Sequence, residues 1–365
     1  MDGIPMEVMR GIGTAFGLPG TLVSCEELKK GNVNSTYLVT YSDGGEEKHY
    51  LFQRVNTYAF RKPIQLMENA DRITEHIRKK HPDAVTLSFY HTFEGKNYLF
   101  IGEDFWRVMN YIPSVTFMSC DDTEIVRNAG VAFGEFQTSL SDFDPNQLHY
   151  TIPGFHDTRG RYAYLKDSVK NDIAGRRNSV KDELDFLLAA EEKACIPTDL
   201  FNAGKLPLRV THNDTKINNV LFDKDTREPL VVIDLDTVMP GIIGSDFGDA
   251  IRYAANFTEE DSADYNKVGV DMDVFRAFAE GFLSKTANEL TDMEAEVLAP
   301  SCYSLSCELA VRFLADYLDG DKYFKINYPD HNLVRARNQI ALAKAMEESM
   351  EKMQAAVREL LKKYR

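Results

Sequence analysis

The stretch THNDTKINN at residues 211–219 contains the pattern His-x-Asp-x4-Asn, and the stretch IDLD at residues 233–236 follows it after two short apolar runs. Phosphoryl transfer from a nucleotide needs a carboxylate that accepts a proton from the attacking hydroxyl, and it needs oxygen ligands that hold Mg²⁺ on the phosphates. We predict that Asp214 is this base and that Asn219 and Asp234 are the metal ligands. His212 is predicted to orient the loop through hydrogen bonds.

A β-hairpin is predicted between Asn219 and Asp234. Residues 220–222 and 230–233 are apolar runs, and the polar residues 223–229 between them form a turn. A hairpin brings the residue before its first strand close to the residue after its second strand, so both side chains are expected at one end. Mg²⁺ prefers oxygen ligands and retains several waters, so these two side chains and the phosphates would suffice.

Several further stretches resemble the aminoglycoside phosphotransferase and choline kinase superfamily, a branch of the protein-kinase-like fold. They are RVTHNDTKINNVL (209–221), VIDLDTVMPG (232–241), DFGDAIR (246–252), RFLADYLDGDKYF (312–324) and HNLVRARNQIALAK (331–344). Within the superfamily the closer resemblance is to the N-acetylhexosamine 1-kinases. The resemblance implies an α+β, two-lobed fold, with a β-rich nucleotide-binding lobe at residues 1–111. The mainly helical C-terminal lobe, residues 112–365, would then carry the catalytic loop and the substrate site.

The hydrophobic patterning of the first 111 residues fits such a lobe, because strands, one main helix and further strands follow each other. A proline at residue 63 and an apolar stripe predict a helix over 63–80. The other predicted elements are a helix at 6–16 and strands at 37–41, 49–55, 85–90, 97–101 and 105–111.

The resemblance also implies where a nucleotide would bind. The turn at residues 31–36 stands in the place of a phosphate-covering loop, although it has a single glycine and is equally compatible with an ordinary surface turn. Its candidate phosphate contacts are Asn34, Ser35 and Thr36. The segment from Met109 to Tyr111 would be the hinge whose backbone binds the adenine edge.

The third strand lacks the lysine that usually contacts the nucleotide phosphates in this fold. Arginine binds phosphate at two points, so Arg54 is the candidate for this role. Its expected partner on the following helix is Glu68 or Glu75, which lie on one face and are not distinguished by the sequence. The alternative is that these residues are solvated surface charges.

Candidate substrate residues lie in the predicted C-terminal lobe. Glu308, Arg312 and Asp316 are spaced at i, i+4 and i+8 on a predicted helix, which is also the pattern of an ion-pair ladder. The resemblance to sugar kinases favours a sugar pocket that includes Arg312 and Tyr323. The full set of candidates is Asp214, His156, Asp236, Arg312 and Tyr323.

Two further aspartates have distinct expected roles. Asp236 lies two residues after Asp234 and would share its face on a strand, so it is a candidate for supporting the metal, for binding sugar, or for an ordinary strand end. Asp246 resembles the superfamily's structural aspartate, which braces the catalytic loop. A capping box at Thr291 predicts a helix that ends before Pro300.

Composition restricts the class of protein further. The chain has 365 residues with 44% hydrophobic residues and a net charge of −15, which favours a globular protein and disfavours a nucleic-acid partner. The five cysteines are scattered and form no Cys-x2-Cys pair, so neither a disulfide framework nor a zinc site is predicted. We predict a cytoplasmic protein with no secretory signal, no membrane span and no implied protein partner.

Together these features predict a kinase that uses ATP and Mg²⁺ to phosphorylate the anomeric hydroxyl of an N-acetylhexosamine. Two alternatives remain open at this point. One is a kinase of the same fold for another hydroxyl, such as that of an aminoglycoside, choline, methylthioribose or homoserine. The other is a nucleotide-binding pseudokinase, which the missing strand lysine favours and the complete set of Asp214, Asn219 and Asp234 disfavours.

Overall fold

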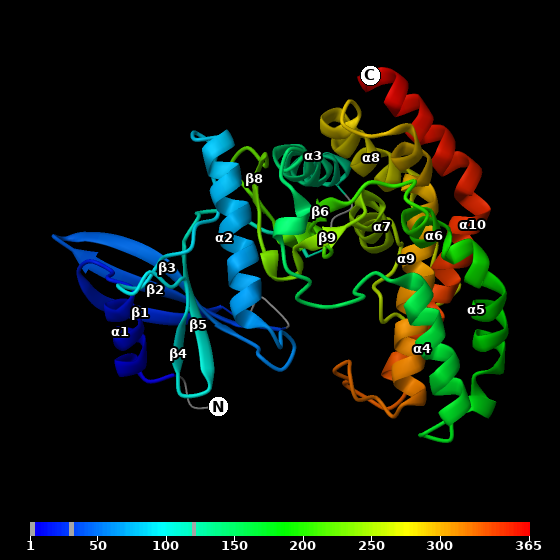
Figure 1. Cartoon of the computed structure of the whole chain (residues 1–365), viewed down its shortest axis with the longest axis horizontal. Coiled ribbons are helices and arrows are strands. Elements are labelled where there is room, and N and C mark those ends of the chain that lie inside the picture. Colours follow the sequence, from blue (N-terminus) through cyan, green and yellow to red (C-terminus); the bar gives the residue numbers. More distant parts are fainter. Residues whose placement is uncertain (1–3, 29–32, 119–121) are drawn as a thin grey trace. The chain divides into compact units, whose positions relative to one another are not determined.

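The computed structural model describes residues 4–28, 33–118 and 122–365, and the chain divides into two compact units (Figure 1). The first unit consists of residues 1–115, 146–152 and 233–239, and the second consists of residues 116–145, 153–232 and 240–365. Asn69, which is buried, explains why two remote segments belong to the first unit. Its side chain exchanges hydrogen bonds of 2.9 and 2.8 Å with the backbone of His149, and donates one of 3.1 Å to the carbonyl of Val238.

An antiparallel sheet with the strand order β1-β2-β3-β5-β4 forms the described centre of the first unit. Gly44 and Gly45 make the turn between β2 and β3, and both have positive φ angles, which glycine adopts without a steric penalty. The strands are β1 (Thr21–Leu28), β2 (Ser35–Asp43), β3 (Glu46–Val55), β4 (Leu99–Ile101) and β5 (Asp104–Asn110).

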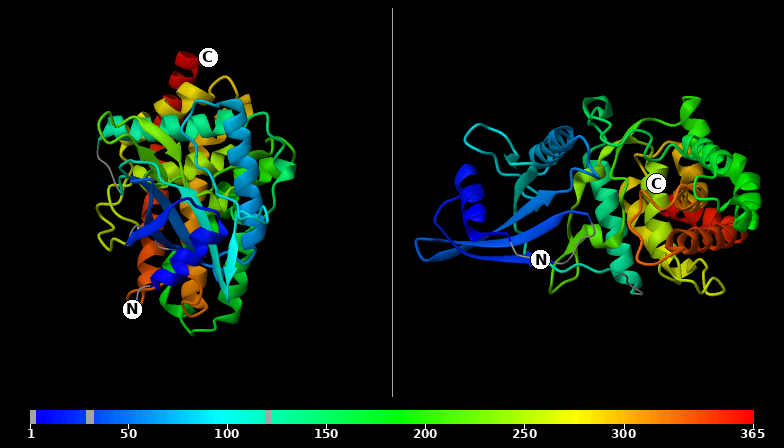
Figure 2. Two further views of the ribbon diagram at one scale, coloured as in Figure 1. Left: turned by 90° about the vertical axis from the view of Figure 1, so that its left-hand side faces the viewer. Right: turned by 90° about the horizontal axis from the view of Figure 1, so that it is seen from below.

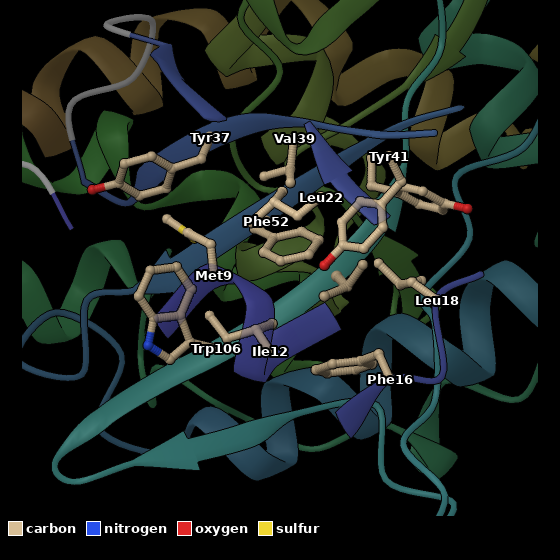
Figure 3. Packing of buried hydrophobic residues seen from close by; sticks show 12 residues of the cluster. Met9, Ile12, Phe16, Leu18, Leu22, Tyr37, Val39, Tyr41, Phe52 and Trp106 are labelled. Atoms are coloured by element: carbon tan, nitrogen blue, oxygen red, sulfur yellow. The ribbon is translucent and has the colours of Figure 1, made fainter. Parts of the chain in front are cut away.

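The core of this unit lies between the sheet and helix α1 (Met6–Ala15). Met9 and Ile12 of α1 are fully buried, and Figure 3 shows them beside Phe52 of β3 and Trp106 of β5. The helix also buries Gly13, where an added Cβ would meet the Tyr41 hydroxyl. This packing buries one face of strands β2 and β3, which carry several of the candidate nucleotide-binding residues.

Helix α2 (Pro63–Lys80) begins with the predicted proline and buries Leu66, Met67, Asn69, Ala70 and Ile73 along one stripe. The predicted strand at residues 85–90 is wrong. Only one isolated bridge, between Phe89 and Met109, forms among the described residues there. The side chain of Asn110 accepts a hydrogen bond from the Ser88 N–H and donates one to the Thr86 carbonyl, so it replaces part of a strand ladder.

The second unit is mainly helical, with α9 packed against α10, α7, α4 and α5 (Figure 1). The long C-terminal α10, red in the views of Figure 2, begins at His331. The helices of the second unit are α3 (Thr123–Ser139), α4 (Thr158–Asn171), α5 (Lys181–Ala194), α6 (Ile196–Asn202), α7 (Ile243–Ala254), α8 (Met272–Thr286), α9 (Asp292–Leu318) and α10 (His331–Tyr364).

Helix α9 opens with the predicted capping box at Thr291, but it continues through Pro300, so the predicted end before this proline is wrong. A proline inside a helix costs about 3 kcal/mol. Burial of nearly every residue from 294 to 318 offsets this cost. The same burial explains why α9, although long and apolar enough to cross a membrane, has 89% of its most apolar window inside the protein, as a core helix does.

The predicted hairpin is confirmed as β7 (Val220–Phe222) and β8 (Pro229–Val232), which pair antiparallel with Val220 opposite Val232. Two short strands, β6 (Arg209–Thr211) and β9 (Met239–Gly241), form a second small sheet. The 3-10 helix η3 (Ile217–Asn219) connects the end of the catalytic motif to β7. Asn219 is therefore one residue from the Val220–Val232 pair, and Asp234 is two residues from it.

Candidate active site

Asp214 lies in the loop between β6 and η3 and is partly buried. Its Oδ1 atom is 3.0 Å from the Nζ atom of Lys216. The Asn219 side-chain amide donates hydrogen bonds to the Asp214 carbonyl at 2.8 Å and to its Oδ2 atom at 3.1 Å. One loop thus brings together a carboxylate, an ammonium group and a carboxamide. The negative charge of the Asp214 carboxylate raises the pKa of Lys216.

Two buried carboxylates of α7 hold the backbone of this loop. Asp246 accepts hydrogen bonds from the N–H groups of His212 at 2.9 Å and Asn213 at 2.7 Å. Asp249 accepts one from the Thr215 N–H at 3.1 Å and also pairs with Arg252. The predicted bracing role of Asp246 is confirmed.

Asn213, which directly precedes Asp214, has a φ of +64°, a left-handed conformation that most residues avoid. Asparagine tolerates it better than most, and the neighbouring Thr211 hydroxyl donates a 3.0 Å hydrogen bond to its side-chain oxygen. The predicted orienting role of His212 is also confirmed. Its Nδ1 atom accepts a 3.3 Å hydrogen bond from the Asp214 N–H, and its ring packs against Phe133 and Phe136.

His156 contacts the same loop from the segment before α4. Its Nε2 atom lies 3.3 Å from the Asn213 carbonyl oxygen, and its Nδ1 atom lies 2.8 Å from Oε1 of Glu308, which is fully buried on α9. The Thr158 hydroxyl donates a 2.7 Å hydrogen bond to the other Glu308 oxygen. Both ring nitrogens of His156 have protein partners, and direct binding of sugar by His156 stays a prediction.

A cavity of about 160 Å³ lies in the second unit beside α9. Arg312 lines this cavity and lies between two aromatic rings. The guanidinium carbon is 5.2 Å from the centre of the Phe155 ring and 5.5 Å from that of the Phe324 ring. Arg312 makes no ion pair with Glu308 or Asp316, so the i, i+4, i+8 row is not a ladder. The lining residues are Arg161, Tyr164, Arg312, Ala315, Asp316, Tyr323 and Phe324.

Asp316 fixes the loop that closes one side of this cavity. Its carboxylate accepts hydrogen bonds from three consecutive backbone N–H groups, those of Lys322, Tyr323 and Phe324, at 2.9, 2.8 and 3.0 Å. The Asn332 side chain donates a further bond of 2.8 Å to it. The three residues spaced at i, i+4 and i+8 on α9 therefore have different roles. Glu308 binds His156, Arg312 lines the cavity, and Asp316 holds the loop that forms one wall of the cavity.

A buried ion pair organises the first unit. Arg107 of β5 and Asp236 are 2.5 Å apart, with side chains 3% and 1% exposed. Arg107 also donates to the Gln53 side-chain oxygen at 2.8 Å, and the Asn34 side chain donates to Asp236 at 2.7 Å. The Asp236 carboxylate thus has two protein partners, and binding of sugar by Asp236 stays a prediction.

The predicted pair of Arg54 with a glutamate of α2 is corrected. Arg54 lies 3.6 Å from Asp104, and both side chains are partly exposed. Glu68 instead lies 2.6 Å from the His149 ring, and Glu75 is 3.8 Å from Lys79. The strand alternates its faces, and Gln53, not Arg54, points to the buried arginine.

The remaining nucleotide candidates are only partly described. Residues 31 and 32 of the predicted phosphate loop lie outside the described residues. The Asn34 side-chain oxygen accepts from the Asn56 N–H at 2.9 Å, and the Thr36 hydroxyl accepts from Gln53 at 2.8 Å, so these side chains already have protein partners. Ser35 opens β2, and Met109 and Tyr111 flank Asn110, the last residue of β5; their nucleotide contacts stay predictions.

Sequence reasoning missed two residues that matter here. Lys216 is the first. Its position two residues after the predicted base could have indicated that its ammonium group lies close to Asp214. Arg107 is the second, and its signal was a lone charge in the apolar strand segment FWRVM at 105–109. A charged residue in such a strand is expected to be buried with a partner.

An antiparallel sheet unit, a helical unit and an Asp-Lys-Asn loop braced by buried carboxylates define a kinase-like phosphotransferase. The chain matches the sequence profile described as the phosphotransferase enzyme family (APH) over residues 24–278, and it belongs to this family. It is therefore a small-molecule kinase that transfers a phosphoryl group to a hydroxyl.

Solved structures share the fold of this chain, at identities that concern the fold alone. A microcompartment-associated aminopropanol kinase shares 15% identity, with a TM-score of 0.65 over 96% of this chain and 99% of that chain. A choline kinase from Cryptosporidium parvum shares 12%, with a TM-score of 0.61 over 98% and 99%. A spectinomycin phosphotransferase, solved with ADP and spectinomycin, shares 12%, with a TM-score of 0.60 over 95% and 100%.

Proposed function

We propose that this enzyme uses ATP and Mg²⁺ to phosphorylate the anomeric hydroxyl of an N-acetylhexosamine, giving the sugar 1-phosphate. The observation that carries the proposal is the cavity lined by Arg312, Tyr323 and Phe324, in the same unit as the catalytic loop. These residues belong to the stretch that resembles sugar 1-kinases. Phe155 contacts Arg312, and the adjacent His156 contacts Asn213, so a short path of contacts links the cavity to the base.

The charge of the cavity supports a neutral acceptor over a cationic one. Two guanidinium groups line it, and no carboxylate of the described residues pairs with Arg161 or Arg312. The one lining carboxylate, Asp316, already accepts from backbone N–H groups. A cationic aminoglycoside or choline would meet like charges. A sugar offers hydroxyl and acyl oxygens, which arginine binds at two points, and ring faces that pack on aromatic side chains.

Asp214 is the proposed base. Its carboxylate would accept the proton of the anomeric hydroxyl as that oxygen bonds to the γ-phosphorus and ADP departs. The solved neighbours that contain ADP or AMP support a nucleotide as the donor. Dependence on ATP also fits the cytoplasmic location predicted from the sequence.

The donor set fits Mg²⁺. Asn219 uses its amide nitrogen on Asp214, which leaves its side-chain oxygen as a ligand, and Asp234 contributes an exposed carboxylate from a left-handed position with a φ of +62°. Hard oxygen ligands of this kind suit Mg²⁺, which retains waters and phosphate oxygens in its remaining positions. When bound, the ion would neutralise charge on the phosphates.

Lys216 replaces Arg54 as the proposed cation for the transferred phosphoryl group. Its ammonium lies 3.0 Å from the base, and its side chain is about one third exposed. It can therefore reach a phosphate without leaving Asp214. Arg107 is unsuited to this role because its guanidinium is buried on Asp236 and Gln53.

Turnover of ATP with separate acceptors tests the proposal, with phosphorus NMR identifying the product. The panel contains N-acetylglucosamine, N-acetylgalactosamine, an aminoglycoside, choline, methylthioribose and homoserine. We expect an anomeric phosphate signal with one or both N-acetylhexosamines. Turnover of another panel member alone would replace the sugar assignment, and ATP binding without any turnover would support the pseudokinase alternative.

A further inference from the structure

The imidazole of His156 lies between two hydrogen-bond acceptors. The first is the Glu308 carboxylate, 2.8 Å from Nδ1, and the second is the Asn213 carbonyl oxygen, 3.3 Å from Nε2. A neutral imidazole carries a proton on only one of its nitrogens. Beside an ionised Glu308, the two contacts are both attractive only if both nitrogens carry protons, so the geometry favours an imidazolium ion.

The surroundings of His156 favour this charged form. Glu308 is fully buried, and besides His156 the Thr158 hydroxyl donates to it. Other charged groups that act on the ring are Asp249 and Asp246 of α7, which favour the proton, and Arg312 of α9, which opposes it. Although burial acts against the charge, Glu308 and Asp249 raise the pKa of His156 above its ordinary value.

The contact of His156 with Asn213 matters because of where Asn213 lies. Its left-handed backbone must be held by several neighbours, since such a conformation persists only where the surroundings determine it. Asp246 accepts a hydrogen bond from its N–H, the Thr211 hydroxyl donates one to its side chain, and His156 contacts its carbonyl oxygen. The peptide that carries this carbonyl also carries the N–H of Asp214.

We propose that His156 is a positioning residue for the base: as a permanent imidazolium held by Glu308, it fixes the Asn213–Asp214 peptide and so the direction of the Asp214 carboxylate. The positioning role rests on the proposed function, because it assumes that Asp214 accepts the proton. Glu308 and Arg312 are one turn apart on α9. The same helix therefore lines the cavity and, through His156, orients the Asp214 carboxylate.

The variant Glu308→Gln tests this inference. Glutamine keeps the size and one acceptor oxygen but removes the negative charge, so the pKa of His156 falls to its ordinary value or below. Above that pKa the ring carries a single proton, and in the tautomer that keeps it on Nδ1 to donate to the glutamine oxygen, Nε2 presents a lone pair to the Asn213 carbonyl and repels it. We expect the ratio of variant to wild-type kcat to be close to one at pH 5.5 and to fall roughly 10- to 100-fold by pH 8, as for a misplaced catalytic group.

Thr158→Val is the matched control. It removes the other hydrogen bond of Glu308 but leaves the carboxylate charge, so its kcat ratio to wild type should not depend on pH. A purely structural role of Glu308 would lower the activity of Glu308→Gln equally at all pH values. A flat ratio in Glu308→Gln would therefore overturn the proposal.

A readout without turnover keeps this inference separate from the choice of substrate. Nitrogen NMR of the imidazole rings in the full-length enzyme should show His156 doubly protonated up to pH 8 or above in the wild type. In Glu308→Gln the ring should titrate at or below the ordinary range, and the Asp214 amide shift should follow it. A neutral His156 at pH 7.5 in the wild type would refute the inference even if no variant folds. Failure of every acceptor would refute only the proposed function.

Discussion

Replacement of Arg312 by methionine separates a substrate role from a structural one. The guanidinium lies over the rings of Phe155 and Phe324 and lines the cavity, and no carboxylate of the described residues pairs with it. Methionine keeps much of the aliphatic stem and contacts aromatic rings favourably. The charge and its hydrogen bonds are lost.

The structure sets the expected magnitudes. Two cation–π contacts at a half-buried site stabilise by about 0.5–1 kcal/mol each, and methionine–ring contacts restore much of that. The free energy of unfolding should fall by less than about 1 kcal/mol, which lowers Tm by roughly 2–4 °C at most. One charged hydrogen bond to a sugar oxygen contributes about 1.5–3 kcal/mol, so sugar affinity should fall about 10- to 150-fold.

Calorimetric titration with N-acetylglucosamine and with a non-hydrolysable ATP analogue measures both affinities, and differential scanning calorimetry measures Tm. Lys344→Met is the control, because it removes a cation 4.9 Å from the Phe186 ring, on a residue that does not line the cavity. We expect weaker sugar binding and unchanged nucleotide binding for Arg312→Met only. Unchanged sugar affinity together with a large loss of Tm would remove Arg312 from the substrate site.

Three further predictions concern the base, the metal and the buried ion pair. Asp214→Asn should lower turnover by about 10²–10⁴-fold, as for a general base, while the nucleotide dissociation constant stays constant; near-normal turnover would exclude that role. Asp234→Ala should mainly raise the Mg²⁺ concentration for half-maximal rate, whereas Asn219→Ala should also lower kcat at saturating Mg²⁺, because its amide holds Asp214; identical Mg²⁺ titrations would contradict both assignments. Arg107→Met should lower the free energy of unfolding by about 3–5 kcal/mol in urea denaturation, because it leaves a buried carboxylate unpaired, whereas the exposed Arg54→Met should cost less than about 1 kcal/mol.

The catalytic loop and its hairpin could be predicted because their chemistry is local. The residues from Asp214 to Asn219 are few and ordered, and short apolar runs around a polar turn specify β7 and β8. The bracing by Asp246 was accessible only through family resemblance. Its hydrogen bonds join residues 33 and 34 positions apart, and no periodicity reveals such a contact.

The errors arose where a tertiary contact decided between local options. Arg54 and Arg107 are both arginines on strands, and only the fold places Asp236, 129 positions away, against the second of them. The spacing of Glu308, Arg312 and Asp316 is correct for a ladder, yet each carboxylate finds a stronger set of donors elsewhere. Pro300 marks a helix end by local rules, but the burial of α9 outweighs it.

The way Asp316 holds its loop has a consequence for how acceptor preference could diverge among related enzymes. Its carboxylate binds main-chain N–H groups, which every residue except proline supplies. The path of the loop is thus set by its main chain and not by the side chains at positions 322–324, which include two of the three aromatic residues of the cavity wall. Those positions can be exchanged in a combinatorial library while the backbone scaffold is kept, so new acceptors can be explored without disturbing the residues that move the proton.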